Sequence, residues 1–254
     1  MMEKISNILQ ILFRYQILFS FGTILGWIIE LLWRRAFEDK RWFNPGFLQG
    51  PWLPVYGVGT IFLYILCSFS IPVYIRAILF LVSLTVLEYV AGLIFLKYFK
   101  IKLWDYSKHW ANLQGLICPL YSLLWTILGF IFYFLIFPFL NNMVNTFYDY
   151  PYLIFFFGIY AGLFGIDLWK SFDIAGKIRH YIVATEGKGH IDFEMLKLEL
   201  SKRVRVGFRN KPLFFLPFRG AGGEGFRETL SKHTANISKR IKTMNKTKNN
   251  LEKK

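Results

Sequence analysis

Cysteine and histidine are scarce in this sequence. Its 254 residues include only Cys67 and Cys118, together with 4 His. No Cys-x-x-Cys pair and no ligand spacing typical of a metal site occurs, and a disulfide framework needs more cysteines. We therefore expect no disulfide scaffold, no bound metal and no cofactor.

Acidic residues are also few, 16 against 31 Lys and Arg, and the excess of basic residues differs between two regions. Residues 1–169 carry 11 Lys and Arg against 8 Asp and Glu, whereas residues 170–254 carry 20 against 8. This change in charge divides the chain into two predicted domains. Residues 1–169 form a transmembrane helical domain, and residues 170–254 form a basic cytoplasmic tail.

Apolar residues, in contrast, are abundant. Hydrophobic residues make up 54% of the chain and aromatics 20%, too much apolar surface for a soluble monomer to bury. A helix that crosses a bilayer needs about 20 mainly apolar residues. The runs that meet this length are residues 15–33, 52–71, 75–96, 116–140 and 152–169. The sequence therefore predicts an all-α membrane protein, a bundle of about five transmembrane helices with a partly helical tail.

Basic residues near these runs alternate between sides. Twelve Lys and Arg fall in the two longer loops and the start of the tail, against three at the other ends of the spans. Basic residues favour the cytoplasmic side. We therefore expect a multi-pass protein of the cytoplasmic membrane with the N-terminus outside and the C-terminus in the cytoplasm.

Carboxylates lie inside two of the predicted spans. Glu30 is in the first and Glu88 in the third, and Asp167 is close to the inner end of the fifth. Each costs a few kcal/mol in a bilayer unless it is paired, protonated or facing protein. Three acids that approach one leaflet, with Arg34, Arg35 and Lys97 as cationic neighbours, indicate a polar pocket open to the cytoplasm. An alternative remains open, in which the acids only hold the helices together through hydrogen bonds.

The two longer loops share a pattern before the chain returns to the membrane. Residues 44–51 and 112–119 carry Asn, Leu and Pro at the same three offsets. They suggest a parallel repeat of two hairpins, a plan found in transporters, although shared turn chemistry would also explain them. Free backbone N–H groups at such returns favour anions. Residues 50–52 and 115–117 are therefore candidate anion contacts.

Loop residues 104–110 are dense in groups that titrate. Asp105, Ser107 and His109 alternate, so an extended segment would place them on one face. Acid–base or nucleophilic catalysis is one interpretation of this pattern, and an interfacial structural loop is the other.

Several of these motifs occur together in one known family. The motifs are Gly26-Trp27 with Glu30, Asn44-x-Gly46-Phe47-Leu48-x-Gly50-Pro51, Pro54-x-Tyr56-Gly57, Glu88, Trp104-Asp105-Tyr106-Ser107 and Asn112-Leu113-x-Gly115. The chain thereby resembles, over about residues 20–130, the bacterial membrane proteins called Putative ABC transporter type IV (CmpB-like). The resemblance implies a permease subunit. The candidate substrate-binding or structural polar site comprises Glu30, Asn44, Gly46, Gly50, Pro51, Tyr56, Glu88, Trp104, Asp105, Tyr106, Asn112 and Gly115.

The chain has no nucleotide-binding motif of its own. Its Gly-rich stretch at 220–225 lacks the Lys and Ser/Thr of a Walker A sequence, so any ATP hydrolysis requires a cytoplasmic ATPase in trans. The basic tail favours adhesion to anionic lipid headgroups; a solvated tail remains an alternative, and nothing in it is typical of a nucleic-acid-binding module.

The predicted function is a transporter or permease-like component of unidentified substrate. Two alternatives remain: an enzyme that acts on lipid headgroups through Asp105, His109 or Glu88, and a non-catalytic membrane scaffold. Catalytic residues are not assigned, and assembly into a homo-oligomer stays open.

Overall fold

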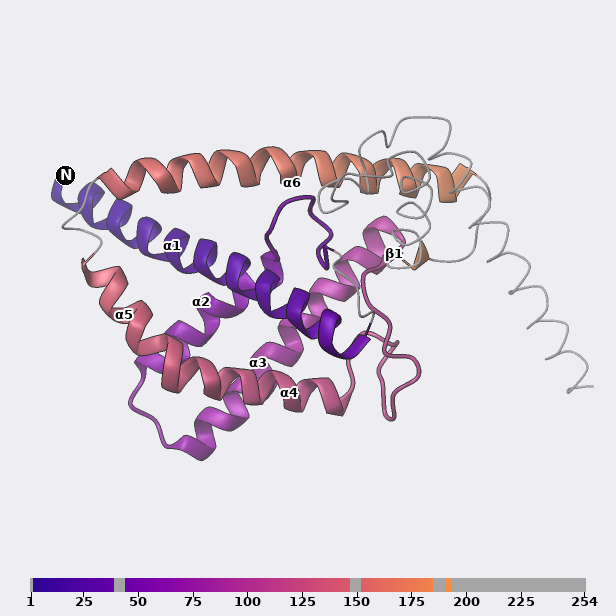
Figure 1. The fold of residues 1–254 in the computed structure, drawn as a ribbon, viewed down its shortest axis with the longest axis horizontal. Helices are drawn as coiled ribbons and strands as arrows, with labels where there is room; N and C mark the ends of the chain where they lie inside the picture. Colours follow the sequence, from indigo (N-terminus) through magenta and orange to yellow (C-terminus); the bar gives the residue numbers. More distant parts are fainter. Residues whose placement is uncertain (1, 39–43, 147–151, 185–190, 193–254) are drawn as a thin grey trace, which may run out of the picture. The chain divides into compact units, whose positions relative to one another are not determined.

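The structure is a computed structural model that describes residues 2–38, 44–146, 152–184 and 191–192. These residues are mainly helical (Figure 1). The chain separates into two compact units, one of residues 1–91 with 106–169 and the other of residues 92–105 with 170–254. Each unit is described by itself. The predicted division of the chain at residue 169 stays a prediction.

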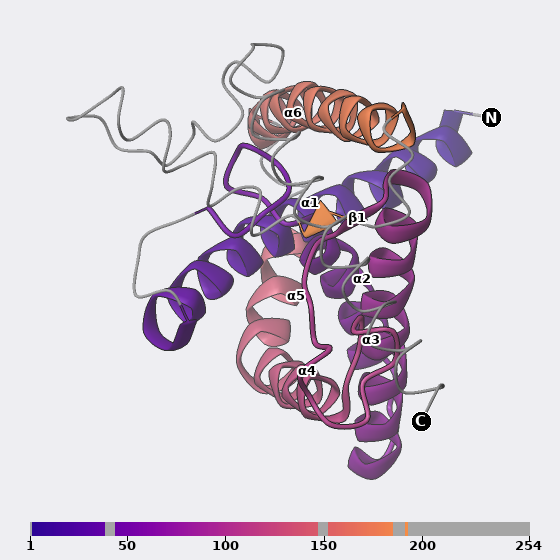
Figure 2. The ribbon, with the colours of Figure 1, turned by 90° about the vertical axis from the view of Figure 1, so that its right-hand side faces the viewer.

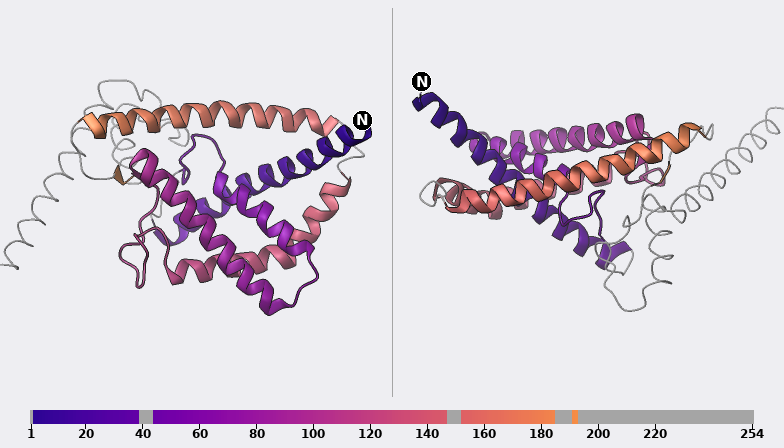
Figure 3. Two further views of the ribbon diagram at one scale, coloured as in Figure 1. Left: turned by 180° about the vertical axis from the view of Figure 1, so that it is seen from behind. Right: turned by 90° about the horizontal axis from the view of Figure 1, so that it is seen from above.

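The first unit is built from consecutive helices, with longer connections before α2 and before α4 than between the other helices, which can be followed in Figure 3. Three helices contain or end in a π-helical turn, at Arg34–Glu38, Phe95–Phe99 and Phe132–Ile136. The helices are α1 (Met2–Trp33), α2 (Pro54–Ser68), α3 (Val73–Ile94), α4 (Pro119–Ile131), α5 (Phe137–Thr146) and α6 (Tyr152–Ala184).

The predicted all-α membrane fold is confirmed. Within the described residues, four helices are long and apolar enough to cross a membrane, at Gln10–Phe37, Val73–Phe99, Pro119–Val144 and Ile154–His180. The second predicted span is shorter than expected, since α2 has 15 residues and a length of about 22 Å. It begins at Pro54 because Leu53 is extended, so the apolar residues before it lie in an irregular segment.

Glycines bring α1 and α2 into close contact. A side chain at Gly22 would collide with Thr60, and one at Gly26 would collide with the ring of Tyr56. On the other helix, a side chain at Gly57 would meet α1. Small residues at four-residue spacing allow such close packing of membrane helices, and they place Tyr56 directly against α1.

Arg76, near the start of α3, closes the C-terminal end of α2. It is 3% exposed, and its guanidinium donates to the carbonyls of Cys67 at 3.3 Å and Phe69 at 2.9 Å. The same group lies 4.0 Å above the ring of Tyr133. The last carbonyls of a helix lack partners within the helix, so Arg76 supplies the donors that α2 needs where it ends.

The second unit contains the end of α3, the end of α6 and two short strands. Strand β1 (Ile101–Lys102) pairs in parallel with β2 (Ile191–Asp192), which lies beside it in Figure 2. Phe95 and Phe99 pack against Phe172 of α6.

Helix α6 is longer than the fifth predicted span, because it continues to Ala184. The first residues of the predicted tail are therefore helical. Apart from residues 191–192, the remainder of the tail lies outside the described residues, as do the predictions for it, including contact with anionic lipid headgroups.

Candidate functional site

One polar cluster forms where α1 meets α2. The Tyr56 hydroxyl donates to Oε2 of Glu30 at 3.0 Å, and Nε of Arg34 donates to Oε1 of the same carboxylate at 3.0 Å. Arg34 lies one turn beyond Glu30, so the pair follows from helix periodicity. The cluster therefore joins two helices and holds an acid that is 25% exposed at its side chain.

A second carboxylate approaches the same tyrosine from α3. Glu88 is 3% exposed, and its Oε1 accepts a hydrogen bond from the Tyr106 hydroxyl at 3.0 Å. Its Oε2 is buried, and the side chain of Trp125 is a second hydrogen-bond donor to this carboxylate. Glu30 and Glu88 both act electrostatically on Tyr56. Of the predicted site residues, the structure thus brings Glu30, Tyr56, Glu88 and Tyr106 together.

The Tyr106 side chain is held in place as a hydrogen-bond donor to Glu88. Its ring stacks on Tyr121 with centroids 4.1 Å apart. Burial, followed by the neighbouring Glu88 carboxylate, raises the pKa of the Tyr106 hydroxyl well above its ordinary range. The hydroxyl therefore remains protonated at neutral pH and is available to donate to Glu88.

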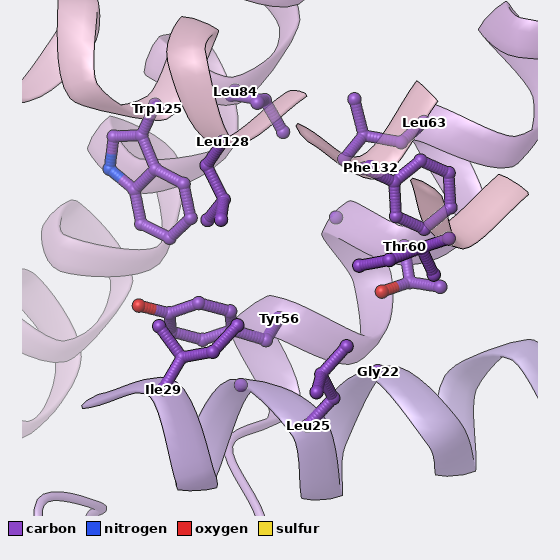
Figure 4. A pocket seen from close by; sticks show the side chains of 13 residues that line it. Gly22, Leu25, Ile29, Tyr56, Thr60, Leu63, Leu84, Trp125, Leu128 and Phe132 are labelled. Carbon is purple, nitrogen blue, oxygen red and sulfur yellow. The ribbon is translucent and has the colours of Figure 1, made fainter. Parts of the chain in front are cut away.

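A cavity lies beside this cluster (Figure 4). It is a small, partly open cavity of about 40 Å³ between α1, α2, α3 and α4. Tyr56 and Trp125 line one end, where their rings meet at a centroid distance of 5.0 Å. In Figure 4 the Tyr56 oxygen and the Trp125 nitrogen lie at that same end. The remainder of the lining is mainly apolar.

The irregular segment before α2, residues 44–53, is organised around Asn44. Its Oδ1 accepts hydrogen bonds from the backbone N–H of Gly46 and the indole N–H of Trp27, both at 3.0 Å. Its Nδ2 donates to the carbonyls of Leu48 and Gln49 at 3.1 and 2.9 Å. Asn44 is 3% exposed. A buried amide with four partners fixes the path of this segment.

The same segment binds a side-chain carboxylate from another helix of the chain. Asp167 of α6 accepts from the backbone N–H of Gln49 at 3.1 Å, from that of Gly50 at 2.8 Å and from the Trp52 indole at 2.6 Å. The predicted anion contact at residues 50–52 therefore has Asp167 as its partner in this structure. Pro51 lies within the irregular segment, and Pro54 rather than Pro51 stands in the first turn of the helix.

The second segment, residues 106–118, is held by Asn112. Its Nδ2 donates to the carbonyls of Ser107 and His109, and its Oδ1 accepts from the N–H of Gly115 at 3.0 Å. The N–H of Leu116 donates to the carbonyl of Leu113. The N–H groups of Gly115 and Leu116 belong to the second predicted anion contact, and both donate to acceptors within the same segment.

The remaining predicted residues, Trp104 and Asp105, belong to the second unit. There Asp105 accepts from the buried Lys102 at 2.6 Å. His109, in the first unit, packs edge to face on Tyr106 and Tyr121. These contacts give no support to the catalytic interpretation of Asp105 and His109.

Some contributors to the site were not singled out from the sequence. Trp125 looks like any other aromatic residue of an apolar run, and only the packing of α4 reveals it. Gly22 and Gly26, in contrast, have the small-x-x-x-small spacing of a helix contact, a signal that the sequence does contain.

Comparison with known proteins gives one match. Neither the curated proteins nor the solved structures contain a match to the chain. The sequence model of one family matches residues 17–172, which extends beyond the motifs at residues 20–130 and includes Asp167. The match covers more than half of the chain, and the chain therefore belongs to the family described as Putative ABC-transporter type IV.

Proposed function

We propose that this protein is the membrane-embedded, permease-like component of a transport system and that it engages its ligand at the cluster of Glu30, Tyr56 and Glu88. Membership of an ABC-transporter-type family and the apolar helices support the general class. The observation that carries the site is the approach of two span-embedded carboxylates, from α1 and α3, to one tyrosine beside a cavity. Ionisable groups inside a membrane commonly mark the path of a substrate or ion.

The proposal includes an orientation and a partner. We place the cluster in the cytoplasmic half of the bundle, with the N-terminus outside, because of the distribution of basic residues. ATP hydrolysis is assigned to a separate cytoplasmic ATPase, because the sequence lacks a Walker A motif. Reporter fusions after Asn145 and after Lys188 test the orientation, which requires signals on opposite sides of the membrane.

The central experiment measures ATP turnover by the complete assembly. The full chain is purified from its own membranes in nanodiscs, and ATP hydrolysis is measured for the wild-type protein and for Glu30→Gln and Glu88→Gln. We expect a copurifying ATPase whose turnover falls several-fold in both variants while the assembly remains intact. Asp173→Asn, which alters an exposed ion pair with Lys177, is the matched control and retains wild-type turnover.

Two results would contradict the proposal. Absence of ATP hydrolysis in the purified assembly would contradict the assignment to an ATP-driven transport system. Wild-type turnover and cellular function in both carboxylate variants would instead support a scaffold whose acids only join helices.

A further inference from the structure

We propose that the second segment carries a lipid-binding surface, the loop tip of Lys108, Trp110 and Leu113, which lies in the phospholipid headgroup layer. The inference goes beyond the proposed function, because it requires neither a transported ligand nor an ATPase. Three features of the first unit carry it: the exposure of the loop tip, the anchoring of the segment inside the membrane and the apolar face of α4 beside it.

The loop tip exposes large apolar side chains next to a basic one. Trp110 is 84% exposed, more than any other large hydrophobic residue that the structure describes, and Leu113 is 51% exposed. Lys108 is exposed as well. Tryptophan and lysine gather at membrane–water interfaces, because each combines an apolar body with a polar end. The composition of the loop tip therefore suits a layer that is apolar on one side and charged on the other.

The backbone of the segment holds Trp110 in its exposed position. The N–H of Tyr106 donates to the carbonyl of Gly115 at 2.8 Å, and the N–H of His109 donates to the carbonyl of Tyr106 at 2.9 Å. Ala111, directly after Trp110, has φ of 50°, a left-handed conformation that is unfavourable for a residue with a side chain. Such local strain is typical of segments that present a functional group.

The same segment is anchored inside the membrane by Tyr106, whose hydroxyl donates to Glu88. From Val73, where this span begins, Glu88 lies about 22 Å along the helix, inside a membrane core that is about 30 Å thick. Trp110 follows Tyr106 by four residues, so their Cα atoms are at most about 14 Å apart. The loop tip is therefore confined to the neighbourhood of the bilayer surface.

The exposed face of α4 adjoins the loop tip. The backbone of Leu113 pairs with that of Ile117, immediately before α4, and the segment lies beside the beginning of α4 in Figure 1 and Figure 3. Leu120 and Leu123 of α4 are exposed, as expected for a span whose outer face contacts acyl chains. Leu113 and Trp110 extend this surface toward the headgroups, which favours lipid over a cytoplasmic protein as the partner.

The side chains of the loop tip match the parts of a phospholipid. The indole ring of Trp110 and the side chain of Leu113 suit the boundary of the acyl chains, where the indole N–H has ester and phosphate oxygens as acceptors. The ammonium group of Lys108 suits the phosphate, which every phospholipid carries, and an anionic surface attracts it further. The loop tip therefore requires a phospholipid surface and not one particular headgroup.

The test measures the depth of a nitroxide label on Leu113→Cys, in the full chain in nanodiscs of phosphatidylethanolamine and phosphatidylglycerol. Collisions of the label with oxygen, which concentrates in lipid, are compared with collisions with a water-soluble nickel chelate. Leu123→Cys on α4 is the lipid reference, and Asp173→Cys, at an exposed ion pair, is the water reference. We expect the oxygen-to-nickel ratio at Leu113→Cys to exceed that at Asp173→Cys several-fold and to stay below that at Leu123→Cys. The native cysteines are buried, and unsubstituted protein treated with the label gives the background.

Variants of Trp110 test what holds the loop tip in the membrane. In the Leu113→Cys protein, Trp110→Ser should lower the oxygen-to-nickel ratio several-fold, whereas Trp110→Tyr, which keeps an amphipathic ring, should retain it. A measurement without cysteines keeps the test decisive if Leu113→Cys does not fold. Phospholipids brominated close to the headgroup should quench the tryptophan emission of the wild type more than that of Trp110→Phe.

Three outcomes would overturn the inference. A ratio at Leu113→Cys equal to that at Asp173→Cys would place the loop tip in water. Equal lipid quenching of the wild type and Trp110→Phe would show that Trp110 does not contact the headgroup layer. A label shielded from both oxygen and nickel would show that protein covers the loop tip. None of these measurements involves ATP turnover, so each of these outcomes leaves the proposed function standing.

Discussion

The segment at residues 44–53 binds a carboxylate from another helix, whereas the segment at residues 106–118 uses N–H groups of Gly115 and Leu116 internally. The two segments share Asn, Leu and Pro at equal offsets. The shared leucines, Leu48 and Leu116, are both buried in the structure. The asparagines, however, have different surroundings: Asn44 is buried and Asn112 is partly exposed.

This difference shows what a repeated motif specifies. The asparagine fixes a local turn in both segments by bonding nearby backbone groups, as short polar side chains do. Whether the turn then receives an anion depends on the packing around it. In the first segment, Trp52 packs edge to face on Tyr160 and Phe164 of α6, which positions Asp167 one turn later.

The largest effect should come from removing the acceptor of the first segment. Asp167→Ala leaves two backbone N–H groups and the Trp52 indole without their acceptor, and we expect a loss of about 4 kcal/mol in the free energy of unfolding. Asp167→Asn keeps one acceptor oxygen and should lose less. Chemical unfolding of the purified protein in mild detergent measures both losses. An alanine variant as stable as the wild type would show that the Asp167 hydrogen bonds do not contribute to stability.

Replacement of the two equivalent asparagines should also lower the stability of the protein to different extents, with the larger loss at Asn44. Asn44→Ala removes four hydrogen bonds in a buried setting and should cost about 3 kcal/mol, whereas Asn112→Ala removes three at a partly exposed position and should cost about 1 kcal/mol. Unfolding of the two variants under identical conditions gives the comparison. Equal losses would mean that the two segments are energetically equivalent despite their different partners.

A smaller effect is expected from the backbone of the second segment. Gly115 has φ of 68°, a left-handed conformation in which a side chain costs about 1 to 2 kcal/mol. Gly115→Ala should lower thermal stability accordingly. Gly158→Ala, in α6, meets nothing within 4 Å and should show no loss; a drop of equal size there would point to a general sensitivity to added methyl groups.

The smallest effect should depend on pH. Tyr106→Phe removes the hydrogen bond to Glu88 and should cost about 1 kcal/mol near neutral pH. Because the folded state raises the pKa of Tyr106, its stabilisation is complete below the unfolded value of about 10 and declines as the pH rises toward the higher folded-state value. The stability difference from wild type should therefore shrink above about pH 10. Tyr98→Phe, at an exposed position, is the control and should show no such trend.

The sequence was sufficient to predict those features that depend only on the local order of residues. Apolar length located the membrane helices, and the cost of a charge in lipid singled out Glu30 and Glu88. Of the cationic neighbours Arg34, Arg35 and Lys97 that the sequence indicated, Arg34 pairs with Glu30. These inferences needed no knowledge of which helices touch.

Features that depend on packing were not accessible in this way. Asp167 was visible as an acid, but its bond to residues 49–52 joins positions more than a hundred residues apart. The apolar run at 52–71 did not show that the helix begins only at Pro54, because Trp52 and Leu53 are equally compatible with a span. Trp125 gained its place from the tertiary contact with Tyr56.

Arg76 has a mechanical consequence for the cavity. Through one guanidinium it fastens the end of α2, the beginning of α3 and the Tyr133 ring, so we expect these walls to shift together as one piece. Helix α1 is held against them by close glycine contacts, by the buried Ile17 and Leu18 in the shared hydrophobic core and by the Glu30–Tyr56 bond. Any movement of α1 away from α2 would therefore open this core as well as break the Glu30–Tyr56 bond.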